Sequence, residues 1–380
     1  VIAITAPATG GRGQQTQLWQ RVDGAWRVSA AHVSLPAPAV NGSVWRTVGT
    51  PLVRGAAAGP LSGETVAVKD LYDLEGFAVG AGIPVYLAES RPATGTSPAV
   101  AALLAAGADV TGIAQTDEFA YSIAGRNPHY GTPPNPAVLG GVPGGSSSGP
   151  ASAVALGQAS IGLGTDTAGS IRVPASYQGL WGLRSTHGSV SADRLLPLAP
   201  TFDSVGWMTR TPAPLRAAAA ATLDAAQQVA VAPSFVMAPA LLEHCEPDVR
   251  AAFERFDFDT VDLGDIDELF LTFRTVQAAE AWATHGSWIS AHPGALGEDV
   301  AGRFAFASTI DSAAEASGRV ALAAARNRLG EVLGDRVLVL PSASSTAPTV
   351  FADPELIERT RQGTLRLTCI AGITGRPALS

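Results

Sequence analysis

The sequence predicts an α/β protein in which a mixed β-sheet is covered by helices on both faces. From residue 61 onward, short apolar stretches with strand character alternate with longer segments of helical pattern. Such alternation is typical of a sheet enclosed between layers of helices. Apolar residues make up 46% of the 380 residues and charged residues only 15%. A chain of this composition can bury a large core, which argues against an intrinsically disordered protein.

Residues 1–36 predict strands that stand apart from this pattern. Two stretches of strand character, Gln14–Gln20 and Ala25–Val33, flank the dipeptide Asp23-Gly24, which is typical of a tight β-hairpin turn. A two-stranded hairpin is only marginally stable in water. We therefore expect this hairpin to belong to a separate sheet domain.

Residues 37–60 are rich in Pro, Gly, Ala and Ser and are predicted to be a linker. Residues 61–380 predict the α/β domain itself. In its first helix, Ser97 is expected to be the N-cap, Pro98 lies in the first turn, and Gly107 closes the helix. The other predicted elements are strands Thr65–Lys69 and Asp109–Ala114, helices Ala217–Ala225 and Asp311–Leu333, and a late strand Arg336–Leu340.

The composition also excludes several classes of protein. The net charge of −8 comes without a basic stripe, so we expect no nucleic-acid partner. No apolar run reaches the roughly 18 residues needed to span a membrane, so no membrane partner is expected. The two cysteines, Cys245 and Cys369, cannot form a disulfide framework, and no Cys/His cluster indicates a metal site. We expect a cytoplasmic protein with neither metal nor cofactor.

Two glycine-rich segments have the features that a catalytic site requires. Gly144–Gly149 has the sequence GGSSSG, and Thr165–Ser170 has the sequence TDTAGS directly after a predicted strand. Glycine runs cost conformational entropy, so a fold keeps them where the backbone needs special dihedrals or close approach. A phosphate-binding loop is the alternative interpretation, but no Gly-Lys-Ser/Thr ends either segment. A nucleophile on a turn after a strand, beside free backbone N–H groups, suits acyl transfer.

The run from Gly144 to Pro174 resembles the signature of the amidase-signature family in residue type and spacing. Within it, Ser146 and Ser170 have the spacing of the family's two catalytic serines. Upstream, the predicted strand that ends at Lys69 resembles the strand that presents the family's catalytic lysine. The resemblance is strong over residues 61–210 and weaker from there to the end.

This resemblance implies an amidase with three catalytic residues. Ser170 would attack the carbonyl carbon and form an acyl-enzyme, Ser146 would shuttle the proton, and Lys69 would be the neutral base. The family's peptide bond before the shuttle serine is cis, so the bond before Ser146 is expected to be cis. A lysine with the reference pKa of about 10.4 is charged at pH 7, so burial must lower the pKa of Lys69.

The resemblance also implies which groups surround these three residues. The backbone N–H groups that would form the oxyanion hole are those of Thr167, Ala168, Gly169 and Ser170. The residues expected to support the loop are Ser147, Asp166 and Arg172. Asp166 and Arg172 are expected to form a salt bridge that braces the loop.

Two alternative interpretations of the site stay open at the level of sequence. Ser147 could exchange roles with Ser146. His187 follows the signature closely, so a Ser–His pair must be considered, although no histidine lies in a GxSxG context. The chain also departs from the family at Arg184-Ser185, where a Lys-Pro pair is common.

The function that the resemblance implies is hydrolysis of the C–N bond of a small carboxamide, with release of ammonia or an amine. One alternative is the glutaminase subunit of a tRNA-dependent amidotransferase, which passes ammonia to a partner. Another is a hydrolase of urea derivatives of the carboxybiuret or allophanate type. The expected partner is a small-molecule amide.

The N-terminal hairpin has its own resemblance. It is similar to the last hairpin of the cone-shaped α+β domains of the nuclear-transport-factor-2-like type. This implies that residues 1–36 are the C-terminal part of a truncated domain, which could pair in a homodimer. The amidase domain, residues 61–380, is likewise expected to be truncated at its C-terminus, because the family continues with another strand and helix.

Overall fold

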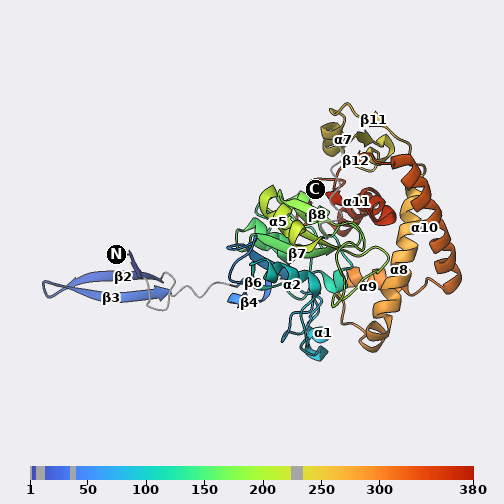
Figure 1. Cartoon of the computed structure of the whole chain (residues 1–380). Helices are drawn as coiled ribbons and strands as arrows, with labels where there is room; N and C mark the ends of the chain where they lie inside the picture. Colours follow the sequence, from blue (N-terminus) through green and yellow to red (C-terminus); the bar gives the residue numbers. More distant parts are fainter. Residues whose placement is uncertain (1, 6–12, 35–39, 224–233) are drawn as a thin grey trace. The chain divides into compact units, whose positions relative to one another are not determined.

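The computed structural model describes residues 2–5, 13–34, 40–223 and 234–380. The chain divides into two compact units, Val1–Asn41 and Gly42–Ser380, which are blue and blue-to-red in Figure 1. The second unit contains every predicted site residue.

The N-terminal unit is a three-stranded antiparallel sheet in the order β1-β2-β3. Its strands are β1 (Ile2–Thr5), β2 (Gly13–Val22) and β3 (Ala25–Ser34). The turn between β2 and β3 has positive φ at both Asp23 (51°) and Gly24 (80°), as a two-residue type I′ hairpin turn requires. The hairpin predicted around Asp23-Gly24 is therefore present, and it pairs with one further strand.

The second unit is built on a seven-stranded mixed sheet in the order β13-β8-β9-β7-β5-β6-β4. The central strands β6, β5 and β7 are parallel, and the strands outside them are antiparallel to their neighbours. This confirms the predicted mixed sheet. The strands are β4 (Trp45–Val53), β5 (Thr65–Lys69), β6 (Asp109–Ala114), β7 (Ile161–Asp166), β8 (Trp181–Arg184), β9 (Ser204–Thr209) and β13 (Ala378–Leu379).

The edge strand β4 differs from the sequence prediction. Residues 37–60 were predicted to be a linker, but Trp45–Val53 pairs antiparallel with β6. The register shifts twice along this pair, and the peptide bond before Pro51 is cis. Proline is tolerated on an edge strand because one side of the strand has no ladder partner. The glycines and prolines that suggested a linker are therefore compatible with a bulged edge strand.

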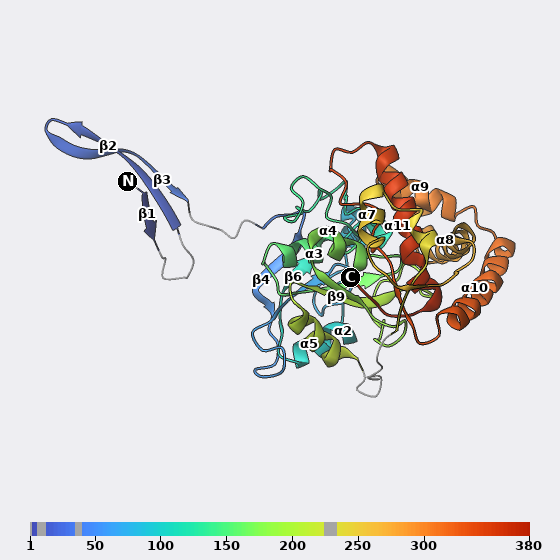
Figure 2. The ribbon, with the colours of Figure 1, turned by 90° about the horizontal axis from the view of Figure 1, so that it is seen from above.

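Helices cover both faces of the sheet (Figure 2). On β5, Val66 and Val68 pack into the core that contains α2 (Pro98–Ala105) and α5 (Pro212–Thr222). Between them, Ala67 packs on the opposite face with α3 (Ser148–Ala155) and α4 (Arg172–Gln178). Successive side chains of a strand alternate between faces. Lys69 therefore points toward the side of α3 and α4, which is where both glycine-rich segments end.

All three predicted helices are present, and the first of them is α2, with Ser97 as its N-cap and Pro98 in its first turn. The helix expected at Ala217–Ala225 is α5 and begins earlier, at Pro212, because proline is well suited to a first helical turn; residues 224 and 225 lie outside the described residues. The long helix expected at Asp311–Leu333 is α10 (Ser312–Leu333), with Asp311 as its N-cap.

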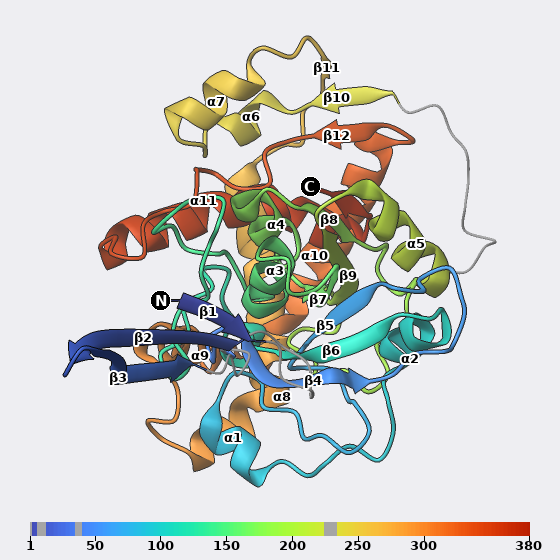
Figure 3. The ribbon, with the colours of Figure 1, turned by 90° about the vertical axis from the view of Figure 1, so that its left-hand side faces the viewer.

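The C-terminal half adds a helical layer and a small three-stranded parallel sheet in the order β11-β10-β12 (Figure 3). Its largest core joins α8, α9, α10 and α11 to the loops that follow β6 and β7. The remaining elements are α1 (Pro84–Glu89), a 3-10 turn at Glu118–Ala120, β10 (Phe235–Met237), α6 (Pro239–Leu242), α7 (Pro247–Phe253), β11 (Asp259–Thr260), α8 (Ile266–Ala291), α9 (Glu298–Ala307), β12 (Val337–Val339) and α11 (Pro354–Thr374).

Candidate active site

The three residues predicted to be catalytic form one continuous chain of hydrogen bonds. The Nζ atom of Lys69 donates to the Oγ of Ser146 at 2.8 Å, and the Oγ of Ser146 donates to the Oγ of Ser170 at 3.0 Å. All three side chains are buried. Residues from strand β5, the first glycine-rich segment and the second glycine-rich segment therefore meet at one point.

The backbone around Ser146 explains why the first segment is rich in glycine. The peptide bond between Gly145 and Ser146 is cis, as the resemblance implied. A Cβ atom at Gly145 would collide with the Asp117 carboxylate and with the backbone of Gly125. The Ser146 carbonyl accepts hydrogen bonds from Thr116 Oγ1 at 2.9 Å and from the Asp117 backbone N–H at 3.2 Å. The serine is thus held in place by the chain that leaves β6.

Lys69 lies in surroundings that favour its neutral form. Burial lowers its pKa from 10.5 to about 7, although the Asp117, Asp166 and Asp203 carboxylates each raise it. Besides Ser146, its amine donates to the Oγ1 of Thr165 at 2.8 Å. An amine with this pKa is neutral in a large fraction of molecules at pH 7 and can accept a proton there.

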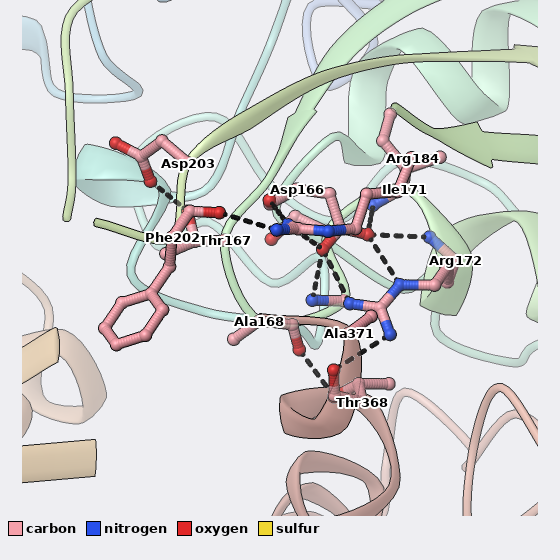
Figure 4. Close-up of polar contacts among 12 residues, drawn as sticks. Asp166, Thr167, Ala168, Ile171, Arg172, Arg184, Phe202, Asp203, Thr368 and Ala371 are labelled. Carbon is pink, nitrogen blue, oxygen red and sulfur yellow. Dashed lines mark hydrogen bonds and ion pairs between the residues drawn. The ribbon is translucent and has the colours of Figure 1, made fainter. Parts of the chain in front are cut away.

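Asp166 is the centre of the loop that carries Ser170 (Figure 4). Its carboxylate accepts from the backbone N–H of Gly169 at 2.8 Å and from both Nε and Nη2 of Arg172 at 3.0 and 2.7 Å. Arg184 lies on its other side, with Nη1 3.2 Å from Oδ1. Burial alone would raise the pKa of Asp166, but the two arginines and these hydrogen bonds hold it below its ordinary value. The carboxylate is thus ionised and fixes the turn, in agreement with the expected salt bridge.

The turn itself presents backbone N–H groups near Ser170, but not all four that were predicted are equally placed. The Gly169 N–H is engaged by Asp166, and the φ of Gly169 is +119°. A side chain at this position would be strained. The N–H groups of Thr167, Ala168 and Ser170 have no such partner among the described residues, so these three remain the candidates for the predicted oxyanion hole.

Helix α11 anchors the same turn from the far end of the sequence. Thr368 Oγ1 donates to the Ala168 carbonyl at 2.7 Å, and the Thr368 carbonyl accepts from Arg172 Nη1 at 2.9 Å. Thr167 Oγ1 donates to Asp203 at 2.5 Å. These contacts fix the loop at further points besides Asp166 (Figure 4).

The neighbouring serines and the candidate histidine take other places. Ser147 is buried and donates to the Thr165 carbonyl at 3.3 Å, and Ser148 donates to Asp117 at 3.0 Å. His187 is exposed, with Nε2 2.9 Å from the Pro200 carbonyl. The geometry therefore favours the Lys69 relay over a Ser–His pair, and it gives Ser147 the position of a loop support.

Three residues that contact the site were missed by the sequence analysis: Thr165, Arg184 and Thr368. Thr165 directly precedes Asp166 at the end of β7, so a hydroxyl at a strand end beside a predicted base was a usable signal. Arg184 was noted only as a departure from the family, although a buried carboxylate needs partners for all of its lone pairs and an arginine can supply them. No local signal marks Thr368, because its contact depends on how α11 packs.

Two absences among the described residues bear on other functions. No group of three or more His, Cys, Asp and Glu side chains is placed to hold a metal ion within those residues. In the described part of the chain, none of the helices has both the length and the apolar character needed to cross a membrane.

The site joins the Lys69 amine through the Ser146 hydroxyl to the Ser170 hydroxyl, beside a turn that presents backbone N–H groups. Serine hydrolases use arrangements of this kind for acyl transfer. Residues 50–274 match the sequence profile of the family described as Amidase. The chain is 34% identical over 357 residues to Amidase 1 of Arabidopsis thaliana, covering 83% of this chain and 84% of that protein. It therefore belongs to the amidase family, the hydrolases that act on amide C–N bonds.

Two further comparisons agree with this assignment. A subunit of 1-carboxybiuret hydrolase from Pseudomonas sp. (strain ADP) is 43% identical over 153 residues, which covers 40% of this chain and 33% of that protein. A solved structure described as an amidase superimposes with a TM-score of 0.74 and 27% identity, covering 84% of this chain and 77% of the other. The fold is thus that of known amidases.

Proposed function

We propose that this amidase cleaves a small carboxamide through an acyl-enzyme on Ser170 and releases ammonia or an amine. The observation that carries the proposal is the buried chain from Lys69 through Ser146 to Ser170, with 2.8 and 3.0 Å steps. Ser170 sits on a turn whose N–H groups can stabilise the oxyanion of a tetrahedral intermediate.

In the proposed mechanism, neutral Lys69 takes a proton from Ser146 while Ser146 takes one from Ser170. The two hydroxyl groups rotate freely enough to reverse the hydrogen bonds of the resting state. Ser170 then attacks the carbonyl carbon, and the proton returns through Ser146 to the leaving nitrogen. The same relay can next activate water for attack on the acyl-enzyme.

The test of this function is ammonia release from a panel of short carboxamides and urea derivatives. Turnover of at least one carboxamide without added partner protein supports a free-standing amidase. Turnover confined to free glutamine, and dependent on a partner, would support the glutaminase alternative instead. A preference for urea derivatives would support the carboxybiuret-type alternative instead.

The pH dependence of amide hydrolysis is expected to follow Lys69. Because the lowered pKa of Lys69 is about 7, the amine is neutral above that pH and protonated below it. Activity should therefore reach a plateau above pH 7 and fall about tenfold per pH unit well below it. The measurement is kcat/KM across a pH series, with His187→Ala as control. A profile that shifts in the His187 variant and persists without Lys69 would contradict the mechanism.

We propose that the N-terminal sheet belongs to a cone-type α+β domain that associates in a homodimer, and that the protein is cytoplasmic. The apolar side chains of Leu18, Trp19, Trp26 and Val28 are exposed on it, and such a group of side chains is expected to be covered by a partner surface. Cys245 and Cys369 are buried free thiols, which suits a reducing compartment. Light scattering should give twice the mass of the whole chain and a monomer after residues 1–36 are removed, whereas a monomeric whole chain would contradict the dimer.

A further inference from the structure

A small cavity lies directly beside Ser170. Its wall includes Thr167 and Ala168 of the predicted oxyanion hole, whereas Lys69 and Ser146 do not line it. The free volume is about 20 Å³, which is room for roughly one water molecule. The cavity therefore reaches the nucleophile from a side that the relay does not occupy.

The charged group in the wall of this cavity is Arg361, which comes from helix α11. Its Nε and Nη2 atoms each lie 2.7 Å from the Glu358 carboxylate. The Arg361 side chain is 13% exposed and that of Glu358 is 45% exposed. Nη1 has no hydrogen-bond partner among the residues that the structure describes. Arg361 is thus a largely buried cation whose partner carboxylate is partly exposed and also accepts from the side-chain amide of Gln362 at 2.6 Å.

Two more arginines stand behind Arg361. Arg303 donates through Nη1 to the carbonyl of Tyr121, a cavity residue, at 2.7 Å, and pairs with Asp299 at 2.6 Å. Arg274 packs over the Phe306 ring at 4.0 Å and makes no ion pair within the described segments. Burial lowers the pKa of both Arg274 and Arg303, and the charge of Arg361 lowers each further. Three guanidinium groups therefore create an excess of positive charge beside the cavity.

A neutral donor completes the site. Gln277 of helix α8 lines the cavity and is 6% exposed, and its side-chain amide has no hydrogen-bond partner in the described part of the chain. An amide and a guanidinium that face the same space suit a carboxylate, because both can donate to its oxygens.

We propose that the substrate carries a carboxylate on its acyl part, so that it is the half-amide of a short dicarboxylic acid, held by Arg361 and Gln277. The proposal rests on the amidase function above. The leaving nitrogen must receive its proton from Ser146, which lies outside the cavity, so the nitrogen faces Ser146 and the acyl chain extends into the cavity. The substrate carboxylate replaces Glu358 on Arg361, which opens the cavity as it binds.

The test compares succinamate with butyramide, which has a methyl group in place of the carboxylate. In the wild type, kcat/KM for succinamate should exceed that for butyramide at least tenfold. Arg361→Met should lower kcat/KM for succinamate about 10- to 100-fold, as expected for loss of a charge-assisted hydrogen bond, and should lower it by a clearly smaller factor for butyramide. Arg359→Met is the matched control, because Arg359 lies on the same helix with a side chain 67% exposed, and it should change neither substrate.

A second variant covers the case in which Arg361→Met fails to fold. Glu358→Gln removes the competing carboxylate, so it should lower KM for succinamate and leave KM for butyramide unchanged. Equal wild-type rates on the two amides, or equal losses in Arg361→Met, would overturn the carboxylate site and leave the amidase function intact. If the wild type hydrolyses neither amide, the proposed function is decided by the wider panel of carboxamides. The site is then decided by calorimetric binding of succinamate, which Arg361→Met must abolish.

Discussion

Replacing Ser170 with alanine is expected to abolish amide hydrolysis. Ser170 ends the relay from Lys69 and lines the cavity. Among the described residues, no other side chain with a hydroxyl both contacts the relay and lines that cavity. Loss of a serine nucleophile of this kind lowers kcat by roughly 10⁶-fold in a comparable enzyme. The measurement is ammonia release by the variant, set against labelling of the wild type with a tagged fluorophosphonate and mapping of the labelled peptide.

The matched control for this experiment is Ser147→Ala. Ser147 is as buried as Ser170, but its hydroxyl donates to the Thr165 carbonyl. This variant should still be labelled on Ser170, since only a loop contact is lost. Label on any residue other than Ser170, or full turnover by Ser170→Ala, would remove Ser170 from its proposed role. A circular dichroism spectrum that matches the wild type would show that loss of activity is not loss of fold.

The elements that local sequence could predict are those whose signal lies within a few residues. The β2–β3 turn needs positive φ at Asp23 and Gly24. Asp-Gly is a dipeptide that commonly adopts this conformation, so the two residues alone predict the turn. Helix α10 begins at its Asp311 cap, whose side chain accepts from the Ala314 N–H. Strand β4 was missed because its place in the sheet is set by pairing with β6, and pairing leaves no mark in a segment rich in glycine and proline.

The same distinction holds for the candidate site. Lys69, Ser146 and Ser170 belong to motifs that can be recognised in order along the chain, and the structure brings their side chains together. Thr368 and Arg361 contact the site or its cavity only because α11 folds back on the turn after β7. Residues 168 and 368 lie 200 positions apart, and no pattern in the sequence relates them. Their contact therefore becomes apparent only in the folded structure. The residues that shape the substrate cavity therefore lie where sequence motifs are weakest.

Removing the Lys69 amine is expected to damage amide hydrolysis far more than ester hydrolysis. An amine leaves the tetrahedral intermediate only if its nitrogen is protonated, and the proton reaches it from Lys69 through Ser146. An alkoxide needs much less assistance to leave. General acid–base assistance is worth about 10²–10⁴ in rate. In Lys69→Ala, kcat/KM should thus fall by a larger factor for an amide than for the matched ester, whereas the wild type should hydrolyse both at similar rates.

The experiment uses kcat/KM for one amide and its methyl ester in the wild type, in Lys69→Ala and in Lys69→Met. Methionine keeps most of the buried volume of the lysine stem, so agreement between the two variants separates loss of the amine from loss of packing. The hydroxyl of Thr165 accepts a hydrogen bond from the lysine amine at 2.8 Å, and both variants remove this donor. The loss of that hydrogen bond should change the rates of amide and ester hydrolysis by the same factor. Selectivity between amide and ester therefore reports on proton delivery alone. Equal losses on the two substrates would mean that Lys69 holds the loop in shape and does not transfer the proton.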